Sequence, residues 1–311
     1  MEKDARIYVA GHRGLVGSAI VRGLLAAGHT NLVYRTHKEL SLIDQAAVRG
    51  FFESERPEFV FMAAARVGGI HANNFYRGEF IYENLAMATN VIDSAHRSDV
   101  KRMVFLGSSC IYPRDCPQPM REEHLLTGPL EQTNEPYAIA KIAGLKMCEA
   151  YNSQYGAEFV AVMPTNLYGI NDNFDLETSH VLPALIRKSH EATLRGDDTL
   201  EVWGTGRPLR EFLFVDDLAE ACIFVMNQHG TTDMLNIGSG EEVSIRELAE
   251  TVCDVVGFTG KIEFDPGRPD GTPRKLLDSS RINRLGWHPK VELREGIRIT
   301  YRWFRETYGN Q

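Results

Sequence analysis

Three glycines that follow a short apolar segment near the N-terminus constrain the fold more than any other feature of this chain. The segment Arg6–Ala10 favours a buried β-strand and runs directly into Gly11-His-Arg-Gly14-Leu-Val-Gly17, after which apolar residues recur at helical spacing. A strand, a glycine turn and a helix in succession let the backbone approach a pyrophosphate at the helix N-terminus. The sequence therefore predicts a dinucleotide-binding fold of the Rossmann type.

Strands and helices are predicted to alternate through the first half of the chain. The pattern predicts strands at Arg6–Ala10, Asn31–Tyr34, Phe59–Ala63, Arg102–Leu106 and Glu158–Met163. It predicts helices at Leu15–Ala27, Asp44–Glu55, Tyr82–Ser98 and Pro136–Tyr155. Such alternation implies right-handed crossovers and a parallel sheet covered on both faces, which is a doubly wound α/β fold.

The alternation loosens beyond about residue 170. The pattern there predicts a helix at Val181–Thr193, a strand and turn at Glu201–Gly206, a helix at Val243–Gly257 capped near Ser244, and a last helix in Leu285–Tyr308 anchored by Trp287, Trp303 and Phe304. We therefore expect a Rossmann domain over residues 1–170, with a return at about residues 210–226, and a smaller α/β substrate domain over residues 171–311.

The end of the second predicted strand indicates which dinucleotide binds. An NAD site normally places Asp or Glu there for the ribose 2′-hydroxyl, but this chain has Arg35-Thr-His37-Lys38 and no acid before Glu39. Arg13 lies inside the glycine loop. Two guanidinium groups suit a 2′-phosphate better than a hydroxyl, so the sequence predicts NADP(H) as cofactor.

Ser108, Tyr137 and Lys141 form the candidate catalytic set. Tyr137 and Lys141 are four residues apart just after a proline, so they share one face of a predicted helix. An ammonium beside a phenol lowers the phenol pKa, and the pair can then move a proton at a carbonyl oxygen. Ser108 follows the fourth predicted strand directly, at the sheet edge where ligands bind. Ser109 is the adjacent alternative.

Several segments together resemble the extended short-chain dehydrogenase/reductases that act on nucleotide sugars. These segments are Gly11–Ser18, Ala64-Ala-Arg-Val-Gly-Gly-Ile70, Gly107-Ser-Ser-Cys-Ile-Tyr-Pro113, Pro164-Thr-Asn-Leu-Tyr-Gly169 and Arg268–Lys275. The resemblance extends over essentially the whole chain. It implies a Rossmann domain, an NADP(H) cofactor and a nucleotide-sugar substrate, and it assigns the catalytic serine to Ser108.

The resemblance also implies an epimerase-reductase chemistry on a GDP-linked 4-keto-6-deoxy sugar. Cys110 and His180 resemble the family's proton-exchanging pair at C3 and C5 of the sugar, and Cys110 should point to the same side of an extended chain as Ser108. Dehydratases of the family carry an acidic pair after the serine, where this chain has Ser109-Cys110. The 4-epimerases keep NAD and an acid at the second strand. A dinucleotide-sensing regulator without catalysis is a further alternative, which retention of all three catalytic residues disfavours.

The remaining contacts are implied by the resemblance alone. The cofactor would contact the glycine loop and the ends of the central strands, namely Gly11, His12, Arg13, Gly14, Leu15, Val16, Gly17, Arg35, His37, Leu106, Gly107, Ser108, Ser109, Lys141, Pro164, Thr165, Asn166, Leu167 and His180. The substrate would contact Lys188, Trp203, Arg210 and Asp270.

Composition narrows the class of partner. The net charge of -8 provides no basic footprint for nucleic acid or an anionic membrane, and no apolar run approaches the length of a membrane span. Five scattered cysteines without Cys-x-x-Cys spacing argue against a disulfide framework and against a zinc site. We expect a reduced cytoplasmic protein without a bound metal.

The two long predicted helices, Tyr82–Ser98 and Pro136–Tyr155, are apolar on more than one face. One face of each should cover the sheet, and the other would be exposed in a monomer. In reductases that resemble this chain the corresponding helices form a dimer interface. We therefore expect a homodimer built on a bundle of four helices.

Overall fold

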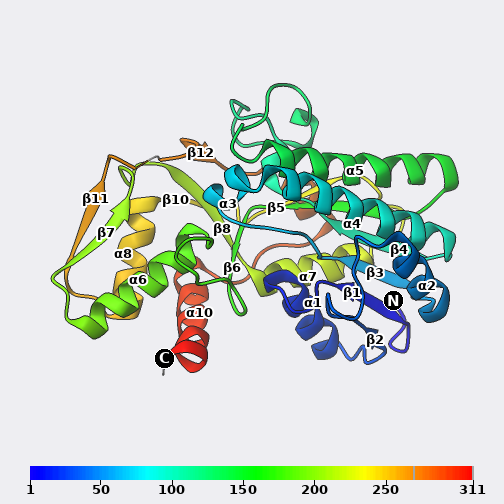
Figure 1. The fold of residues 1–311 in the computed structure, drawn as a ribbon, viewed down its shortest axis with the longest axis horizontal. Helices are drawn as coiled ribbons and strands as arrows, with labels where there is room; N and C mark the ends of the chain where they lie inside the picture. Colours follow the sequence, from blue (N-terminus) through cyan, green and yellow to red (C-terminus); the bar gives the residue numbers. More distant parts are fainter. Residues whose placement is uncertain (269, 310–311) are drawn as a thin grey trace.

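A six-stranded parallel sheet forms the centre of the first lobe (Figure 1). The computed structural model describes residues 1–268 and 270–309. The strand order is β2-β1-β3-β4-β5-β9, and every neighbouring pair is parallel. The strands are β1 Ile7–Ala10, β2 Leu32–Val33, β3 Phe59–Met62, β4 Arg102–Leu106, β5 Phe159–Pro164 and β9 Leu235–Ile237. The order reverses between β1 and β3, where sheets of this kind bind ligands.

Helices cover both faces of this sheet, which confirms the predicted doubly wound α/β fold. Ile7 and Val9 belong to the core beneath α1 and α7, whereas Tyr8 belongs to the core beneath α2, α4 and α5, because successive strand side chains point to opposite faces. The helices of this lobe are α1 Leu15–Ala26, α2 Gln45–Glu55, α3 Ile70–Phe75, α4 Arg77–Arg97, α5 Glu135–Tyr155 and α7 Val215–Met226. In Figure 1, α4 and α5 lie side by side on one face of the sheet.

The first turn of α1 lies directly against the loop that follows β1. A Cβ atom on Gly17 would be 2.1 Å from the carbonyl oxygen of Gly11, closer than two unbonded atoms can approach. Gly11 itself has a φ of +80°, in the left-handed region. Glycine is therefore required at both positions for the helix to begin so close to the strand.

A second lobe with its own core lies beside the carboxyl end of the sheet (Figure 1). Its central strand β8 pairs in parallel with β6 and β12 and antiparallel with β10, while β7 and β11 form a separate parallel pair. The strands are β6 Asn166–Tyr168, β7 Thr199–Trp203, β8 Leu209–Phe214, β10 Glu242–Ser244, β11 Lys261–Asp265 and β12 Arg274–Lys275. The helices are α6 Val181–Arg195, α8 Ile245–Val256 and α10 Leu293–Tyr308.

Helix α8 begins and ends where the sequence indicates. The Ser244 hydroxyl accepts from the Glu247 amide at 3.1 Å, and the Glu247 carboxylate accepts from the Ser244 amide at 2.7 Å. This reciprocal capping box satisfies two amides at the helix start, and Gly257 ends the helix with a φ of +88°.

The C-terminal half contributes more to the first lobe than the sequence indicated. Strand β9 joins the sheet beside β5, and Ile282 of α9 (Ser280–Leu285) is buried in the core beneath α1 and α7. Trp287 is buried in the same core, so the prediction that it anchors the last helix is wrong. Phe304 does anchor α10, because the centroid of its ring lies 4.7 Å from the centroid of the Phe174 ring in the second lobe. The domain boundary near residue 170 stays a prediction.

Candidate functional site

A cavity of about 910 Å³ opens at the carboxyl ends of the central strands. The loops that follow β1, β3, β4 and β5 all contribute to its wall, as expected for ligand sites in parallel sheets. Most of the predicted site residues line it, namely Gly11, Gly14, Leu15, Val16, Arg35, His37, Leu106, Gly107, Ser108, Ser109, Cys110, Tyr137, Lys141, Pro164, Thr165, Asn166, Leu167 and His180.

Three of the predicted cofactor residues do not line the cavity. Gly17 is buried under the glycine loop, where it allows the close approach of α1. The His12 ring stacks on Tyr34 with 4.6 Å between centroids, and Arg13 is exposed at the edge of the loop. The four predicted substrate residues also lie outside the cavity wall, in the second lobe.

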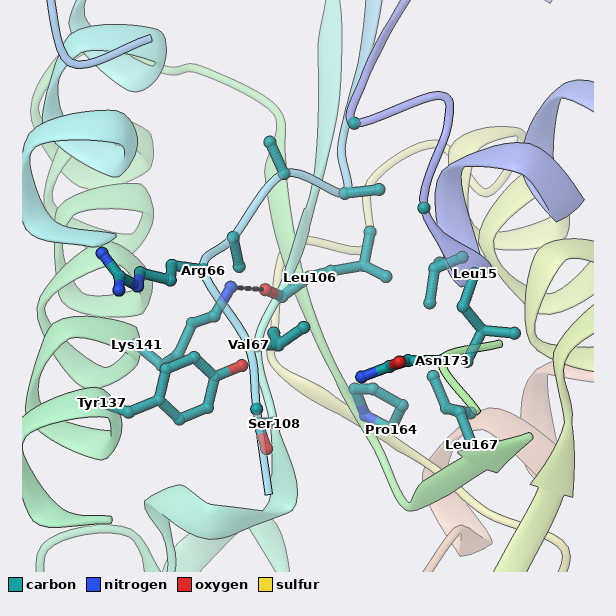
Figure 2. A pocket seen from close by; sticks show the side chains of 18 of the residues that line it. Leu15, Arg66, Val67, Leu106, Ser108, Tyr137, Lys141, Pro164, Leu167 and Asn173 are labelled. Carbon is teal, nitrogen blue, oxygen red and sulfur yellow. Dashed lines mark hydrogen bonds between the residues drawn. The ribbon is translucent and has the colours of Figure 1, made fainter. Parts of the chain in front are cut away.

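Tyr137, Lys141 and Ser108 meet at one side of the cavity. Figure 2 shows Tyr137 and Lys141 extending from α5 toward the loop that carries Ser108, with Leu15 and Leu167 on the opposite side. The Lys141 ammonium donates to the Leu106 carbonyl at 2.7 Å, and its Nζ lies 5.7 Å from the centroid of the Tyr137 ring. Helical spacing on α5 and the end of β4 therefore bring the predicted catalytic set together.

The pKa of Tyr137 is raised in this structure, whereas the sequence predicted a lowered one. The protein that surrounds the phenol raises the pKa of Tyr137, the neighbouring Cys110 raises it further, and a hydrogen bond with Ser108 opposes the rise only in part. Burial also lowers the pKa of Lys141 to about 8. Desolvation is the largest influence on the phenol, so Tyr137 is protonated at neutral pH.

Cys110 lies in a 3-10 helix, Ser109–Ile111, and not in the extended segment that the sequence predicted. The helix forms because the Ser108 side chain caps it, accepting from the Cys110 amide at 3.4 Å. Both side chains still line the cavity. Burial raises the pKa of the Cys110 thiol, whereas the charge of Lys275, a hydrogen bond with Ser108 and the charge of Lys141 lower it.

His180 is the N-cap residue of α6 and enters the cavity from the second lobe. The surrounding protein lowers the pKa of its imidazole, and the positive charge of Lys275 lowers it further. The loop before it is tied to the loop after β3, because the Gly69 amide donates to the Thr178 carbonyl at 3.0 Å. Cys110 and His180 are thus brought to one cavity from different lobes.

Arg35, which follows β2, is already engaged in an ion pair and a hydrogen bond. Arg35 forms an ion pair with Glu55 of α2, and its Nη1 donates to the Tyr34 carbonyl at 2.9 Å. Glu39 accepts from the Thr36 amide at 2.7 Å and from its hydroxyl at 2.8 Å, and these bonds lower the pKa of its carboxyl. The sequence alone indicated neither carboxylate as a partner of this loop.

The four predicted substrate residues form one cluster in the second lobe. The Lys188 ammonium lies 5.2 Å from the centroid of the Trp203 ring, and the indole is 54% exposed. The Arg210 Nη2 lies 3.5 Å from the Asp270 carbonyl oxygen. The Asp270 carboxylate accepts from the Thr205 amide at 2.6 Å and from its hydroxyl at 2.8 Å. An exposed ring, a carboxylate and two cations in one place suit a charged, ring-bearing ligand.

Sequence reasoning missed other residues of the cavity wall. The loop after β3 contributes Arg66, whose amide donates to the Asn84 side chain of α4 at 3.0 Å. Its position after a central strand was a usable signal, because Ser108 was chosen for the same reason, as a residue that directly follows a central strand. Asp172 and Lys275 also line the wall, and only tertiary packing brings them there.

Two further features bear on the class of site. Across residues 1–268 and 270–309, no group of three or more His, Cys, Asp or Glu side chains is arranged to hold a metal ion. No helix within these residues combines the length and the apolar character that crossing a membrane requires.

Comparison with known proteins places the chain in a family. The model of the NAD dependent epimerase/dehydratase family matches residues 7–238. GDP-L-fucose synthase 1 of Arabidopsis thaliana is 59% identical over 310 residues, covering 100% of this chain and 96% of that protein. GDP-L-fucose synthase of Escherichia coli K12 is 53% identical over 310 residues, covering 97% of each.

The fold of a solved relative agrees with this placement. A GDP-L-fucose synthetase from Naegleria fowleri, whose crystal structure has NADP bound, superposes with a TM-score of 0.92 at 30% identity, covering 99% of this chain and 96% of that chain. Residues 7–238, which the family model matches, contain the glycine loop, Ser108, Tyr137 and Lys141. These residues contribute to the resemblance to nucleotide-sugar reductases. This chain belongs to the NAD dependent epimerase/dehydratase family.

Proposed function

We propose that this protein converts GDP-4-keto-6-deoxymannose to GDP-L-fucose, epimerising the sugar at C3 and C5 and reducing it at C4 with NADPH. One observation carries the proposal: Ser108, Cys110, Tyr137, Lys141 and His180 line the same cavity. The names of relatives that match nearly the whole chain at 53% and 59% identity support the same product.

The glycine loop and the strand ends fit a dinucleotide cofactor. Gly14, Leu15 and Val16 at the start of α1 line the cavity, where amides at a helix N-terminus suit a pyrophosphate. The His12 Nδ1 atom is buried without a hydrogen-bond partner among the described residues. Arg35 and His37 also line the cavity, and Arg35 can bind a 2′-phosphate in exchange for its ion pair with Glu55. NADPH, when bound, supplies the hydride for C4.

Proton exchange at C3 and C5 requires a polarised C4 carbonyl. The hydroxyls of Ser108 and Tyr137 can both donate to that oxygen, which acidifies the hydrogens on the two neighbouring carbons. Cys110 and His180 come from different lobes, so the two groups can address opposite faces of a sugar held between them. One group removes a proton to give an enolate, and the other returns a proton to the opposite face.

Reduction requires a proton at O4 as well as a hydride at C4. The raised pKa of Tyr137 keeps its phenol protonated at neutral pH, which is the state that can donate this proton. Lys141 lies beside the ring and holds a positive charge below a pH of about 8, so it can stabilise the phenolate that forms. Tyr137 is therefore the proton donor of the reductive step.

Purified protein mixed with GDP-4-keto-6-deoxymannose and NADPH tests the proposal. Loss of NADPH absorbance should accompany formation of a sugar with the L-fuco configuration, identified by NMR. A product reduced without inversion at C3 and C5 would leave only the reductase part of the proposal. Binding of NADPH without any consumption would favour a regulatory protein instead.

We further propose NADPH as the preferred cofactor, because Arg13 and Arg35 border the predicted site of the 2′-phosphate. The dissociation constant for NADPH should be at least about tenfold lower than that for NADH. Replacing Arg35 by Met should remove most of the difference, whereas replacing Arg56, an exposed arginine just after α2, should not change it. Equal constants for the two cofactors in the unmodified protein would contradict a role for the two arginines in this preference.

We also propose a homodimer through α4 and α5. Their outer surface exposes Tyr82 and Ile139 by 64% and 40%, next to half-buried Ala86 and Ala143. A two-fold bundle of four helices would cover these side chains. Light scattering should give twice the 35.0 kDa chain mass, and Ile139→Glu should shift the protein toward the monomer. A fully active 35.0 kDa species at micromolar concentration would exclude this assembly.

A cytoplasmic location is the last part of the proposal. All five cysteines are free and buried, a state that a reducing compartment maintains. Cell fractionation with an antibody against the protein would test the location directly.

A further inference from the structure

Lys275 lies in the cavity wall at a position that the strands of the second lobe fix. Lys275 pairs with Arg210 where β12 runs parallel to β8. The next two amides are held as well, since Leu276 donates to the Gln118 side chain at 2.8 Å and Leu277 donates to the carboxylate of the fully buried Glu211 at 3.0 Å. The backbone at Lys275 and directly after it is therefore anchored, while its side chain is half-buried and lines the cavity.

The ammonium of Lys275 acts on both members of the proton-exchanging pair. It lowers the pKa of the Cys110 thiol. Burial lowers the pKa of Lys275 itself, and the Cys110 thiol opposes that shift. It also lowers the pKa of the His180 imidazole. Its charge therefore favours the thiolate of Cys110 and disfavours the imidazolium of His180. When Cys110 removes the proton, His180 must first take up a proton in order to return one; when neutral His180 removes it, the Cys110 thiol returns one and becomes the thiolate.

The other groups around Cys110 have weaker or different effects on the thiol. Ser108 donates to it as a neutral group, and Lys141 lowers its pKa less than Lys275 does, with an ammonium held by the Leu106 carbonyl. Tyr137 is protonated and therefore neutral, so it contributes no charge. Arg210, next to Lys275 in the ladder, repels the Lys275 ammonium and lowers its pKa. Among the groups that lower the pKa of Cys110, Lys275 therefore has the largest effect.

Any proton exchange through Cys110 passes through its thiolate. When the thiolate takes a proton from C3 or C5, it becomes a thiol and the substrate becomes an enolate; when the thiol returns a proton, the thiolate forms again. Burial in the cavity wall makes that anion costly, and a fixed cation nearby offsets the cost.

We propose that Lys275 is a positioning residue whose ammonium stabilises the thiolate of Cys110 during proton exchange at C3 and C5. The part about C3 and C5 rests on the proposed function, whereas the effect of Lys275 on the thiol does not. Lys275, from the second lobe, thereby acts on Cys110, which follows β4 in the first lobe.

Alkylation of Cys110 tests the electrostatic step without any substrate. Iodoacetamide reacts with the thiolate, so the rate of Cys110 modification, followed by mass spectrometry against pH, reports the thiol pKa. For Lys275→Met the midpoint of this profile should move to higher pH. At a fixed pH below the midpoint, a move of one pH unit slows modification about tenfold. Lys275→Arg, which keeps the charge, should stay near the profile of the unmodified protein.

Arg274→Met is the matched control. Arg274 is the neighbouring residue of the same short strand, but it is exposed and paired with Glu242, so its loss removes the same charge outside the cavity. Its alkylation profile should equal that of the unmodified protein. If Lys275→Met also leaves the profile unchanged, the proposal is overturned.

A second measurement links the altered thiol pKa to catalysis. Incubation with GDP-4-keto-6-deoxymannose in deuterated water, without NADPH, reports exchange at C3 and C5. Lys275→Met should slow exchange at neutral pH and recover part of the rate at higher pH, with a larger effect on kcat than on KM. A raised KM with an unchanged pH profile would assign Lys275 to substrate binding and overturn the proposal. If the unmodified protein exchanges no deuterium, the proposed function fails, while the alkylation result still decides the role of Lys275.

Discussion

The two groups of predicted site residues differ in how the protein holds them. The polar groups of Tyr137 and Lys141 are enclosed, and Lys141 is only 5% exposed. Burial is therefore the largest influence on the pKa of each group. In the second lobe, Trp203 is 54% exposed, Lys188 and Arg210 are half-buried, and the charged residues contact one another or the ring. An enclosed, anchored group can transfer a proton with defined geometry, whereas an exposed cluster can exchange its contacts for those of a ligand.

This difference predicts which kinetic constant, kcat or KM, each kind of substitution should change. Changes in the enclosed wall remove a group that works mainly in the transition state, so they should lower kcat. Changes in the exposed cluster remove contacts made equally in the ground state and the transition state, so they should raise KM. Three substitutions and one pH profile can break or sharpen this distinction.

The largest effect is expected for Tyr137→Phe. The substitution removes the proton donor and leaves the ring, so kcat for reduction should fall on the order of a thousandfold with the NADPH dissociation constant unchanged. Stopped-flow reduction and fluorescence titration of NADPH measure the two quantities. A mainly KM-based loss would place Tyr137 with the exposed cluster and break the distinction.

Cys110→Ser should affect epimerisation more than reduction. A serine hydroxyl ionises far less readily than a thiol, so deuterium exchange at C3 and C5 should fall by about a hundredfold or more. Hydride transfer to a 4-keto sugar should persist, because Tyr137 and Lys141 are intact. Full deuterium incorporation at both carbons would remove Cys110 from the mechanism.

Arg210→Met tests the second-lobe cluster, in which Arg210 itself is half-buried. Loss of a charge-assisted hydrogen bond to a diphosphate should raise KM by about tenfold to a hundredfold, with kcat nearly constant. Arg207→Met, an exposed arginine in the turn before β8, is the matched control and should leave both constants unchanged. A fall in kcat as large as that expected for Tyr137→Phe would show that Arg210 acts on the reacting atoms.

The pH dependence of reduction should report Lys141. Its ammonium is present below a pKa of about 8 and is lost as the pH rises through that value. The kcat for reduction should therefore fall above about pH 8, by about tenfold per pH unit at the limit. Lys141→Arg keeps the charge at all these pH values, so its profile should lose the fall even if its maximal rate is lower. A fall that persists in this variant would have another origin.

Local patterns in the chain predicted the first lobe closely. Strand β4 was predicted residue for residue at Arg102–Leu106, and α2 began one residue after its predicted start, at Gln45. The short second-lobe strands were mostly missed, since β10 has three residues and β12 two, too few for a periodic pattern to show. Their existence depends on β8, which lies between them and provides the hydrogen bonds.

The sequence by itself determined that a glycine turn precedes a helix, that Ser108 ends a strand and that Tyr137 and Lys141 share a helical face. Each of these follows from contacts between residues close in the chain, where steric and hydrogen-bonding rules act locally. Only the tertiary structure decided that burial raises the pKa of Tyr137, and that Lys275 reaches the wall that holds Cys110 and His180. Desolvation and charge proximity depend on which distant segments pack together, and no short pattern in the sequence encodes that packing.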